Sequence, residues 1–230
     1  MWSDRSNIRH MRCTFSNSRI YGAMVPKKEP AERRGRGRPQ SFERETALCA
    51  AMRLFWDRGY EGTSFDDLIA TMGISASSFY NAFGSKEALY HEAIETYMSV
   101  AGGWFLDILN ENIDTITAFR KLTTTAAMEF TRDDQPSGCM ISVAATQCSP
   151  GQSRLRDLLA SQRTQAEGAM AERLRVGMSA GDLPENTDID ALAAFYGSLL
   201  RGMAVQARDG ASRDRLLEIA RIGMRAWPAI

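Results

Sequence analysis

Residues 63–86, TSFDDLIATMGISASSFYNAFGSK, decide the fold of this 230-residue chain. The stretch predicts two short helices joined by a tight turn at Gly73, with a third helix beginning at Ser85. Thr63 and Ser64 are good N-cap residues, and the two Asp residues that follow lie in a first turn, where carboxylates interact favourably with the helix dipole. Two helices of this size joined by a glycine turn have the dimensions of a helix-turn-helix.

The second helix of this pair has one apolar side and one polar side. Phe79 and Phe83 lie on the side that we expect to be buried. The outward side chains are small and polar, namely Ser75, Ser77, Ser78 and Asn81. A helix that enters the DNA major groove needs exposed side chains that are short enough for close approach and that form hydrogen bonds. The pattern therefore favours DNA binding.

Charge is unevenly distributed along the chain, although the net charge is zero. Residues 1–40 contain ten Lys or Arg and three acidic residues, so residues 41–230 carry the compensating negative charge. A basic arm on an acidic body favours a polyanionic partner over the alternative of a solvated tail. Within this arm, Arg36 and Arg38 could enter the minor groove, or they could attract phosphates without sequence preference.

Composition disfavours several other classes of protein. The four Cys residues form no CxxC pair and have no His at ligand spacing, so we expect no metal site and no cofactor. No apolar run approaches the roughly 20 residues that cross a bilayer. We therefore expect a reduced, cytoplasmic protein. An enzyme is disfavoured because the chain has no glycine-rich phosphate loop, and a helical adaptor that binds no DNA is a further alternative.

Helical periodicity runs from residue 41 to the C-terminus and predicts an all-α fold of about nine helices. We expect residues 1–40 to be a disordered basic arm, in which Met24 is a candidate start that would make residues 1–23 an upstream extension. Residues 41–88 form the helix-turn-helix domain and residues 89–230 a second helical domain. A single helix from about Ser85 to about Leu109 connects the two, and Gly102-Gly103 could bend it.

Residues 38–90 resemble the N-terminal DNA-binding domain of the TetR family of bacterial transcriptional regulators. The resemblance rests on three motifs in order, which are FWxxGYxGTS at residues 55–64, MGIS at 72–75 and FYxxFGSKEAL at 79–89. It implies a homodimer that binds a palindromic operator in double-stranded DNA, usually as a repressor, and that is released by a small-molecule effector. The implied location of the effector site and of the dimer surface is the C-terminal domain, residues 89–230.

The resemblance also implies roles for individual residues. Thr63 would cap the first motif helix against a phosphate, and Tyr80 would contact another phosphate. Lys86 would hold the DNA backbone from the start of the next helix, and Asn81 could reach a base. The start of the recognition helix would contact base edges and phosphates through Ser75, Ala76, Ser77 and Ser78. Ala82 departs from the His or Tyr that is common in relatives, so one phosphate or packing contact is missing there.

The C-terminal domain offers two further sets of candidates. For a dimer interface on the last two helices, the candidates are Ala193, Gly197, Leu200, Ala204, Leu216 and Ala220, whose small members permit close helix approach. For a ligand pocket in the middle helices, the candidates are Trp104, Phe105, Phe119, Met128, Phe130, Cys139, Met140, Met170 and Tyr196. Each set has an ordinary alternative, which is that its residues complete the core of one protomer.

Cys139 suggests a second mechanism for the same fold. It follows a loop and opens an apolar segment that ends at Cys148, so a helix N-terminus could lower the pKa of its thiol and make the thiol reactive. The protein would then be a redox or electrophile sensor. The alternative is a buried cysteine with a structural role only.

Overall fold

The computed structural model describes residues 43–143 and 153–228, and every regular element in those ranges is helical. The elements are α1 (Arg44–Arg58), α2 (Phe65–Met72), α3 (Ala76–Phe83), α4 (Lys86–Val100), α5 (Trp104–Leu109), α6 (Thr115–Phe130), α7 (Met140–Val143), α8 (Ser153–Ser179), α9 (Ile189–Arg208), α10 (Arg213–Gly223) and a final 3-10 turn (Met224–Ala226). The all-α prediction is confirmed, with ten α-helices in the described part of the chain. The basic arm, including Arg36 and Arg38, and Cys148 lie outside the described residues.

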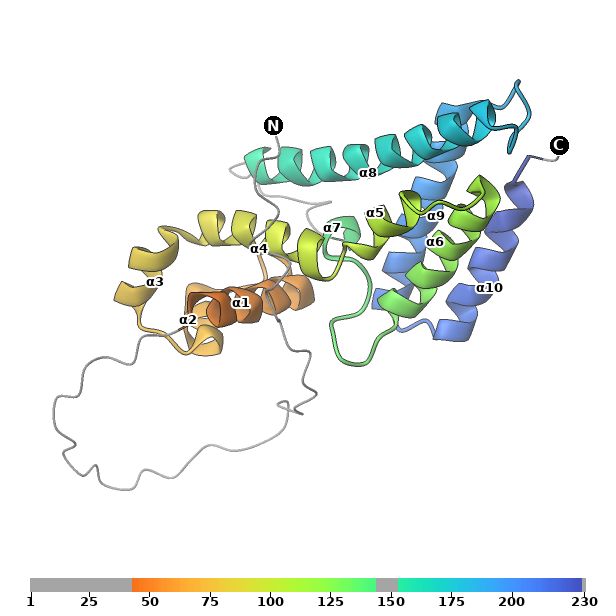
Figure 1. The fold of residues 1–230 in the computed structure, drawn as a ribbon. Coiled ribbons are helices and arrows are strands. Elements are labelled where there is room, and N and C mark those ends of the chain that lie inside the picture. Colours follow the sequence, from red (N-terminus) through yellow and green to blue (C-terminus); the bar gives the residue numbers. More distant parts are fainter. Residues whose placement is uncertain (1–42, 144–152, 229–230) are drawn as a thin grey trace, which may run out of the picture.

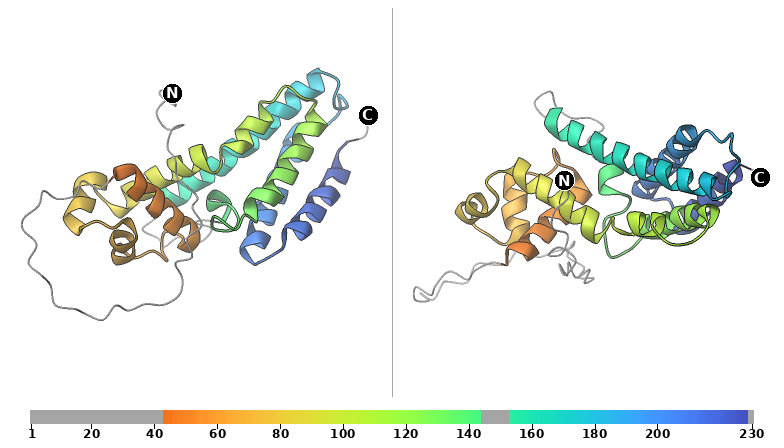
Figure 2. Two further views of the ribbon diagram at one scale, coloured as in Figure 1. Left: turned by 60° about the horizontal axis from the view of Figure 1, so that its bottom comes forward. Right: turned by 45° about the horizontal axis from the view of Figure 1, so that its top comes forward.

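The helices form two bundles connected by α4 (Figure 1). Helices α1, α2 and α3 pack beside α4, whereas α5, α6, α9 and α10 form the second bundle. The long helix α8 runs along the second bundle and extends over α4, as the two views in Figure 2 also show. Leu155 and Leu159, from the start of α8, belong to the same apolar core as α1 and α4. The two bundles are therefore joined by side-chain packing as well as by the chain.

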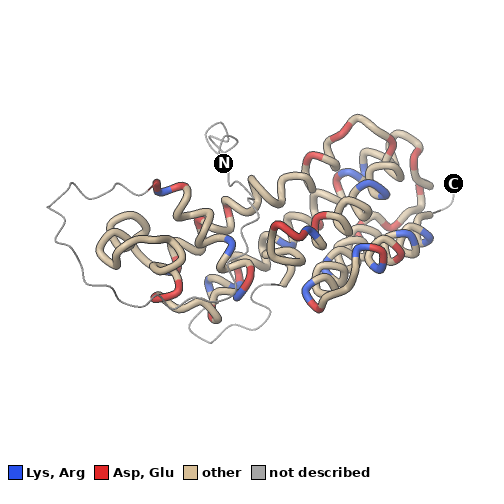
Figure 3. Tube along the Cα trace, turned by 90° about the horizontal axis from the view of Figure 1, so that it is seen from below, with Lys and Arg blue, Asp and Glu red and all other residues tan. Residues whose placement is uncertain are grey.

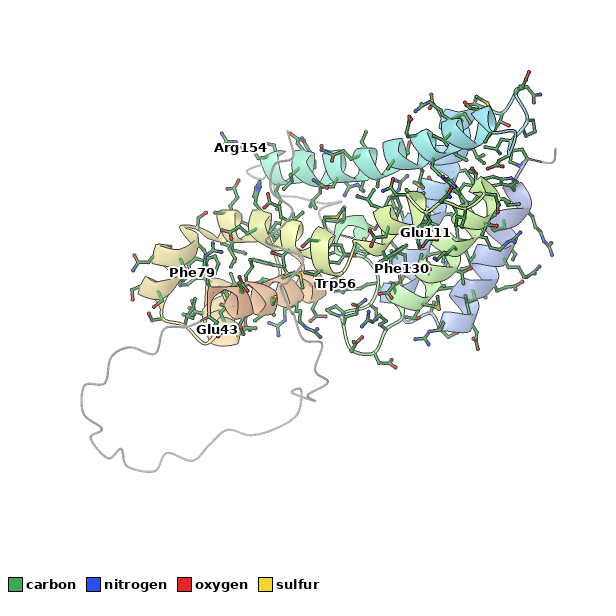
Figure 4. All side chains as sticks on the ribbon, viewed as in Figure 1. Glu43, Trp56, Phe79, Glu111, Phe130 and Arg154 are labelled. Atoms are coloured by element: carbon green, nitrogen blue, oxygen red, sulfur yellow. The ribbon has the colours of Figure 1, made fainter. Side chains whose placement is uncertain are left out.

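Aromatic packing forms the core of the N-terminal bundle. The rings of Phe55 and Tyr90 meet edge to face with centroids 4.8 Å apart, and Tyr60 lies 5.1 Å from Tyr90. Phe79 is fully buried on the inner side of α3 (Figure 4), and Phe83 is buried one turn later. Because these two residues hold the inner face of α3 against the bundle, the opposite face of α3 is exposed.

The helix expected from about residue 85 to about residue 109 is two helices. The backbone N–H groups of Ala101 and Gly102 both donate to the carbonyl of Tyr97, at 2.9 and 2.8 Å. The regular i to i−4 ladder stops at that point, and α5 starts only at Trp104. The glycine pair therefore ends the helix, where the sequence predicted no more than a bend.

A second core fills the C-terminal bundle. Phe119 of α6 lies 4.8 Å from Tyr196 of α9 and 5.3 Å from Trp227, measured between ring centroids. Burial raises the pKa of Tyr196 to about 12, so its hydroxyl stays neutral. None of the helices in the described ranges has the length and hydrophobicity needed to span a membrane.

Candidate nucleic-acid interface and effector pocket

Helix α2 begins at a capping box. The Ser64 hydroxyl accepts a hydrogen bond from the Asp67 backbone N–H at 3.0 Å, and the Asp67 carboxylate accepts one from the Ser64 backbone N–H at 3.2 Å. The hydrogen bonds from Ser64 hold the pKa of Asp67 below its ordinary value. Gly73, with φ of 66°, then supplies the left-handed residue that ends α2 and turns the chain toward α3.

The structure corrects the role expected for Thr63. Its side chain is fully buried, and its hydroxyl donates to the carbonyl of Gly59 at 2.7 Å. The hydroxyl thus satisfies a carbonyl at the end of α1, and Ser64 caps α2 in its place. Two adjacent hydroxyl residues could each be the cap, and the turn after α1 directs the first of them inward. Thr63 has no surface from which to reach a phosphate.

Helix α3 presents the polar face that the sequence predicts. The Ser75 side chain caps the helix by accepting from the Ser78 backbone N–H at 3.2 Å. The hydroxyl of Ser75 also lies 3.0 Å from those of Ser77 and of Ser78, so the three serines form one network. Ser75, Ala76, Ser77, Tyr80 and Asn81 are exposed, and Ser78 is half-buried. Among the expected contact residues that the structure describes, all except Thr63 and Lys86 therefore come together on α3 and its cap.

The ring of Tyr80 is held in place by Phe65, a residue that the sequence analysis did not identify. Its side chain is 57% exposed, yet its ring stacks on Phe65 of α2 with centroids 5.3 Å apart and an interplanar angle of 22°. A tyrosine whose ring is fixed in this way loses little rotamer freedom when its hydroxyl binds a partner. The signal in the sequence was an apolar residue directly after the cap of α2.

Lys86 is also positioned by an aromatic ring. Its ammonium nitrogen lies 4.3 Å from the ring centroid of Tyr60, which is a cation–π geometry. Partial burial lowers the pKa of Lys86, against a smaller opposing effect of Glu61. Nearby, the carbonyl of half-buried Ala82 accepts a hydrogen bond from Arg44 at 3.2 Å. The methyl group of Ala82 packs against the apolar core of the N-terminal bundle.

A cavity of about 100 Å³ lies where the end of α4 meets α5, α6, α7, α8 and α9. Five of the expected pocket residues line it, namely Trp104, Phe105, Phe130, Cys139 and Met170. Its wall is mostly apolar, but Arg163 and Arg201 are among the lining residues. Arg201 lies 3.6 Å from the Glu167 carboxylate, and Arg163 donates to the carbonyl of Ile141 at 3.1 Å. These two arginines were missed because nothing in the sequence shows that Arg163 of α8 and Arg201 of α9 lie beside the same cavity.

Four expected pocket residues lie elsewhere. Phe119 and Tyr196 pack against each other and against Trp227 in the core of the C-terminal bundle. Met140 is 1% exposed and belongs to the core beneath α4, while Met128 is 43% exposed at the surface. An apolar residue in a helical pattern can face a core, a cavity or solvent, and periodicity alone does not separate these outcomes.

The residues expected at the dimer interface are buried inside one protomer. Ala193, Gly197, Leu200, Ala204, Leu216 and Ala220 are all buried, and none belongs to an exposed surface. Their small side chains do allow close helix approach, but the helices that approach are α6, α8, α9 and α10 of the same chain. The exposed apolar residues of the last two helices are Phe195, Val205 and Ile222, at 41%, 44% and 51% exposure.

Cys139 is half-buried and lies beside Tyr97. Burial raises the pKa of Tyr97 well above its ordinary value, and the neighbouring thiol adds to the effect. The helix that Cys139 precedes is described only as the four residues of α7. The expected helix from Cys139 to Cys148 therefore lies partly outside the described residues.

Comparison with known proteins agrees with this arrangement. Residues 47–93 match the family model of bacterial regulatory proteins of the tetR family, and residues 117–222 match that of the tetracyclin repressor-like C-terminal domain. The chain is 32% identical over 199 residues to the HTH-type transcriptional repressor ComR of Escherichia coli, which covers 86% of this chain and 95% of the relative. It is 26% identical over 207 residues to the repressor BdcR of Escherichia coli, covering 90% and 98%.

Among solved structures, one match is a cysteine mutant of the TetR family regulator CifR complexed with a 26-bp double-strand operator DNA. That structure has 40% sequence identity and a TM-score of 0.80, and the match covers 83% of this chain and 100% of the other. The chain belongs to the TetR family of bacterial transcriptional regulators.

Proposed function

We propose that this protein is a transcriptional repressor that binds a palindromic DNA operator as a homodimer and that a small molecule releases it. The observation that carries the proposal is the exposed face of α3, where Ser77 and Asn81 are flanked by a ring-supported Tyr80 and a ring-supported Lys86. Residues 41–88 are the DNA-binding unit in this proposal, and residues 89–230 bind the effector and the partner. The CifR mutant bound to its operator supports the assignment by analogy.

A dimer is required because one α3 contacts too little DNA for tight and selective binding. Two copies related by a two-fold axis would place their recognition helices about 34–36 Å apart, or a multiple of that, on a palindrome. The surface that suits this contact is the outer face of α9 and α10, which carries Phe195, Val205 and Ile222. Because Phe195 and Val205 are separated by ten residues with exposed Ser198 and Gly202 between them, they form one stripe along α9.

Helix α4 connects the effector cavity to the DNA-binding surface. Lys86 is its first residue, and Tyr97 and Met98, near its end, line the cavity. The two positions are about 16 Å apart along one helix. An effector that binds better when α4 is tilted would change the spacing of the two recognition helices, and it could do so only through its difference in affinity for the two states.

A titration of labelled DNA from upstream of the protein's own gene tests the proposal. We expect a shift to a complex with two protomers per site and a loss of affinity on adding the cognate effector from a metabolite panel. Failure to prefer any duplex over random DNA would exclude the repressor and would favour a helical adaptor. We expect regulation rather than catalysis, in agreement with the regulators that the chain resembles, and a cytoplasmic location.

A second candidate mechanism is covalent sensing at Cys139, because this thiol is part of the cavity wall. The cavity, at about 100 Å³, is smaller than the engineered cavity of about 150 Å³ that holds benzene. A ligand of about five heavy atoms gains at most about 7 kcal/mol from non-covalent contacts. That corresponds to roughly 10 μM affinity. A small electrophile that forms a carbon–sulfur bond with the Cys139 thiolate would not have this limit.

The thiol mechanism has a direct test. N-ethylmaleimide adds the Cys139 sulfur to one alkene carbon, and a proton from water completes the other carbon, so no oxidant is needed. We expect this reagent to weaken operator binding by the wild type and not by Cys139→Ser. Ser142→Ala, which alters the same cavity wall, is the matched control and should respond like the wild type. An equal response of Cys139→Ser would exclude the mechanism.

A further inference from the structure

The reading surface of α3 contains no charged side chain. The helix, ASSFYNAF, has neither Lys, Arg, Asp nor Glu (Figure 3), and its exposed residues are Ala76, Ser77, Tyr80 and Asn81. Arg and Lys are the side chains that make the paired contact with guanine O6 and N7. Helix α3 therefore has no side chain that can read guanine in this way.

Three cations of the described N-terminal bundle are held by other groups. The ammonium of Lys86 lies over the Tyr60 ring at 4.3 Å. The Arg58 guanidinium lies 3.3 Å from the Asp67 carboxylate, and Arg44 lies 2.7 Å from the Glu92 carboxylate. Arg44 also donates to the Ala82 carbonyl at 3.2 Å. With these contacts, the three cations can stabilise the bundle or bind the phosphate backbone. They do not extend along α3 into the major groove.

Asn81 differs from its polar neighbours in its hydrogen bonding. The hydroxyls of Ser75, Ser77 and Ser78 lie within hydrogen-bonding distance of one another, so part of their capacity is used inside the protein. The exposed Asn81 amide has no hydrogen bond to any other residue of the described chain. An amide offers one donor and one acceptor side by side, which matches N7 and the N6 amino group of adenine in the major groove.

We propose that Asn81 is the specificity-determining residue of α3 and that it reads one adenine in each operator half-site through N6 and N7. This inference rests on the proposed function, because it needs α3 to lie in the major groove. Ser77 lies one turn before Asn81 on the same face, about 6 Å away along the axis. Base pairs are about 3.4 Å apart. The exposed face of α3 thus spans about two base pairs. The methyl group of Ala76, at the edge of this face, suits contact with a thymine methyl group.

Selection of bound duplexes from a random pool, carried out with the full-length protein, identifies the base read by Asn81. With the wild type we expect a palindrome with an invariant adenine in each half-site. With Asn81→Ala the preference at that one position should fall by about 5- to 150-fold, which is the range for a paired amide–adenine contact, and preferences elsewhere should stay. Asn110→Ala, on the exposed end of α5, is the matched control and should select the wild-type sequence.

Base analogues then separate a contact from an indirect effect. Replacing the selected adenine by 7-deazaadenine removes N7, so wild-type affinity should fall by about 2- to 10-fold per half-site, whereas Asn81→Ala should show no further loss. If the selected half-sites instead have an invariant guanine, or if Asn81→Ala keeps every preference, the inference is overturned while the repressor assignment stands. If the wild type selects no sequence at all, the proposed function itself is wrong.

Discussion

Replacing Lys86 by methionine removes the positive charge that lies over the Tyr60 ring and keeps an unbranched side chain at that position. Lys86 is the first residue of α4, where a positive charge opposes the helix dipole. Relief of that repulsion and loss of the cation–π contact with Tyr60 have opposite signs and are each worth up to about 1 kcal/mol, so the free energy of unfolding should change little. A change in DNA binding would then reflect the lost charge and not a damaged fold.

The magnitude follows from counterion release. Each phosphate contact contributes about 0.9 to the slope of log affinity against log salt concentration. A dimer that loses two Lys86 contacts should thus lose about 1.8 from this slope. Between 50 and 200 mM salt, wild-type affinity should fall about 12-fold more than that of Lys86→Met.

Fluorescence anisotropy of a labelled operator, measured at five or so salt concentrations within that interval, gives the two slopes. Lys121→Met is the matched control, because Lys121 is exposed on α6 and pairs with Glu111 at 2.5 Å, in the C-terminal bundle. Its slope should equal that of the wild type. Equal slopes for Lys86→Met and the wild type would refute the placement of Lys86 on a phosphate.

Three further outcomes are expected. Val205→Asp should convert the dimer to a monomer in light scattering, because it puts a charge in the apolar stripe of α9. Val176→Asp, at a similarly exposed apolar position on α8, should leave the dimer intact. If both variants were monomeric, the assignment of the dimer interface to the outer face of α9 would be wrong. Thr63→Val should lower the free energy of unfolding in urea by about 1 kcal/mol, because the Gly59 carbonyl loses a buried partner, and should not alter the salt slope of DNA binding; an altered slope would restore the DNA-contact role. Ser64→Ala should destabilise the protein most above the unfolded-state pKa of Asp67, since a carboxyl whose pKa is lowered on folding contributes stability there and loses it as the pH falls through its folded pKa; a stability difference that stays constant down to strongly acidic pH would count against the capping box.

The local signals of the helix-turn-helix were sufficient to predict its structure. The turn at Gly73, the helix that begins at Ser85 and the buried Phe79 and Phe83 are all as the sequence predicted. Each of these features depends on interactions within a few residues, so the sequence pattern contains the needed information. The prediction that Thr63 caps α2 was wrong, because the choice between two adjacent cap residues depends on the turn after α1, which is a tertiary feature.

Pairing between distant helices was not predictable in the same way. Helical periodicity shows which side of α9 is apolar, but it does not show whether that side meets its own chain or a second copy. The burial of Gly197 illustrates the ambiguity, since a Cβ there would lie 3.4 Å from Met170 of α8 and 3.2 Å from the Glu167 carboxylate. The small residue permits close approach within one protomer, which the same pattern would equally permit between protomers.

The effector cavity shows the same limit. Trp104, Phe105 and Phe130 were predicted because they are large apolar residues of the middle helices, and all three line the cavity. Residues of α8 and α9 line it too, and the arginines among them are polar residues in helices that the pattern describes as amphipathic. A cavity forms where several packed helices leave a space unfilled, so the pattern of one helix cannot predict it.

The central claim is that a dimer recognises DNA through the exposed face of α3. One competition titration tests it most directly, in which a labelled palindrome obtained by selection is displaced by its unlabelled copy or by a scrambled duplex at about physiological salt. The account predicts two protomers per duplex and displacement by the specific copy at a concentration at least about 1,000-fold lower than by the scrambled one. Equal displacement by both duplexes would contradict it.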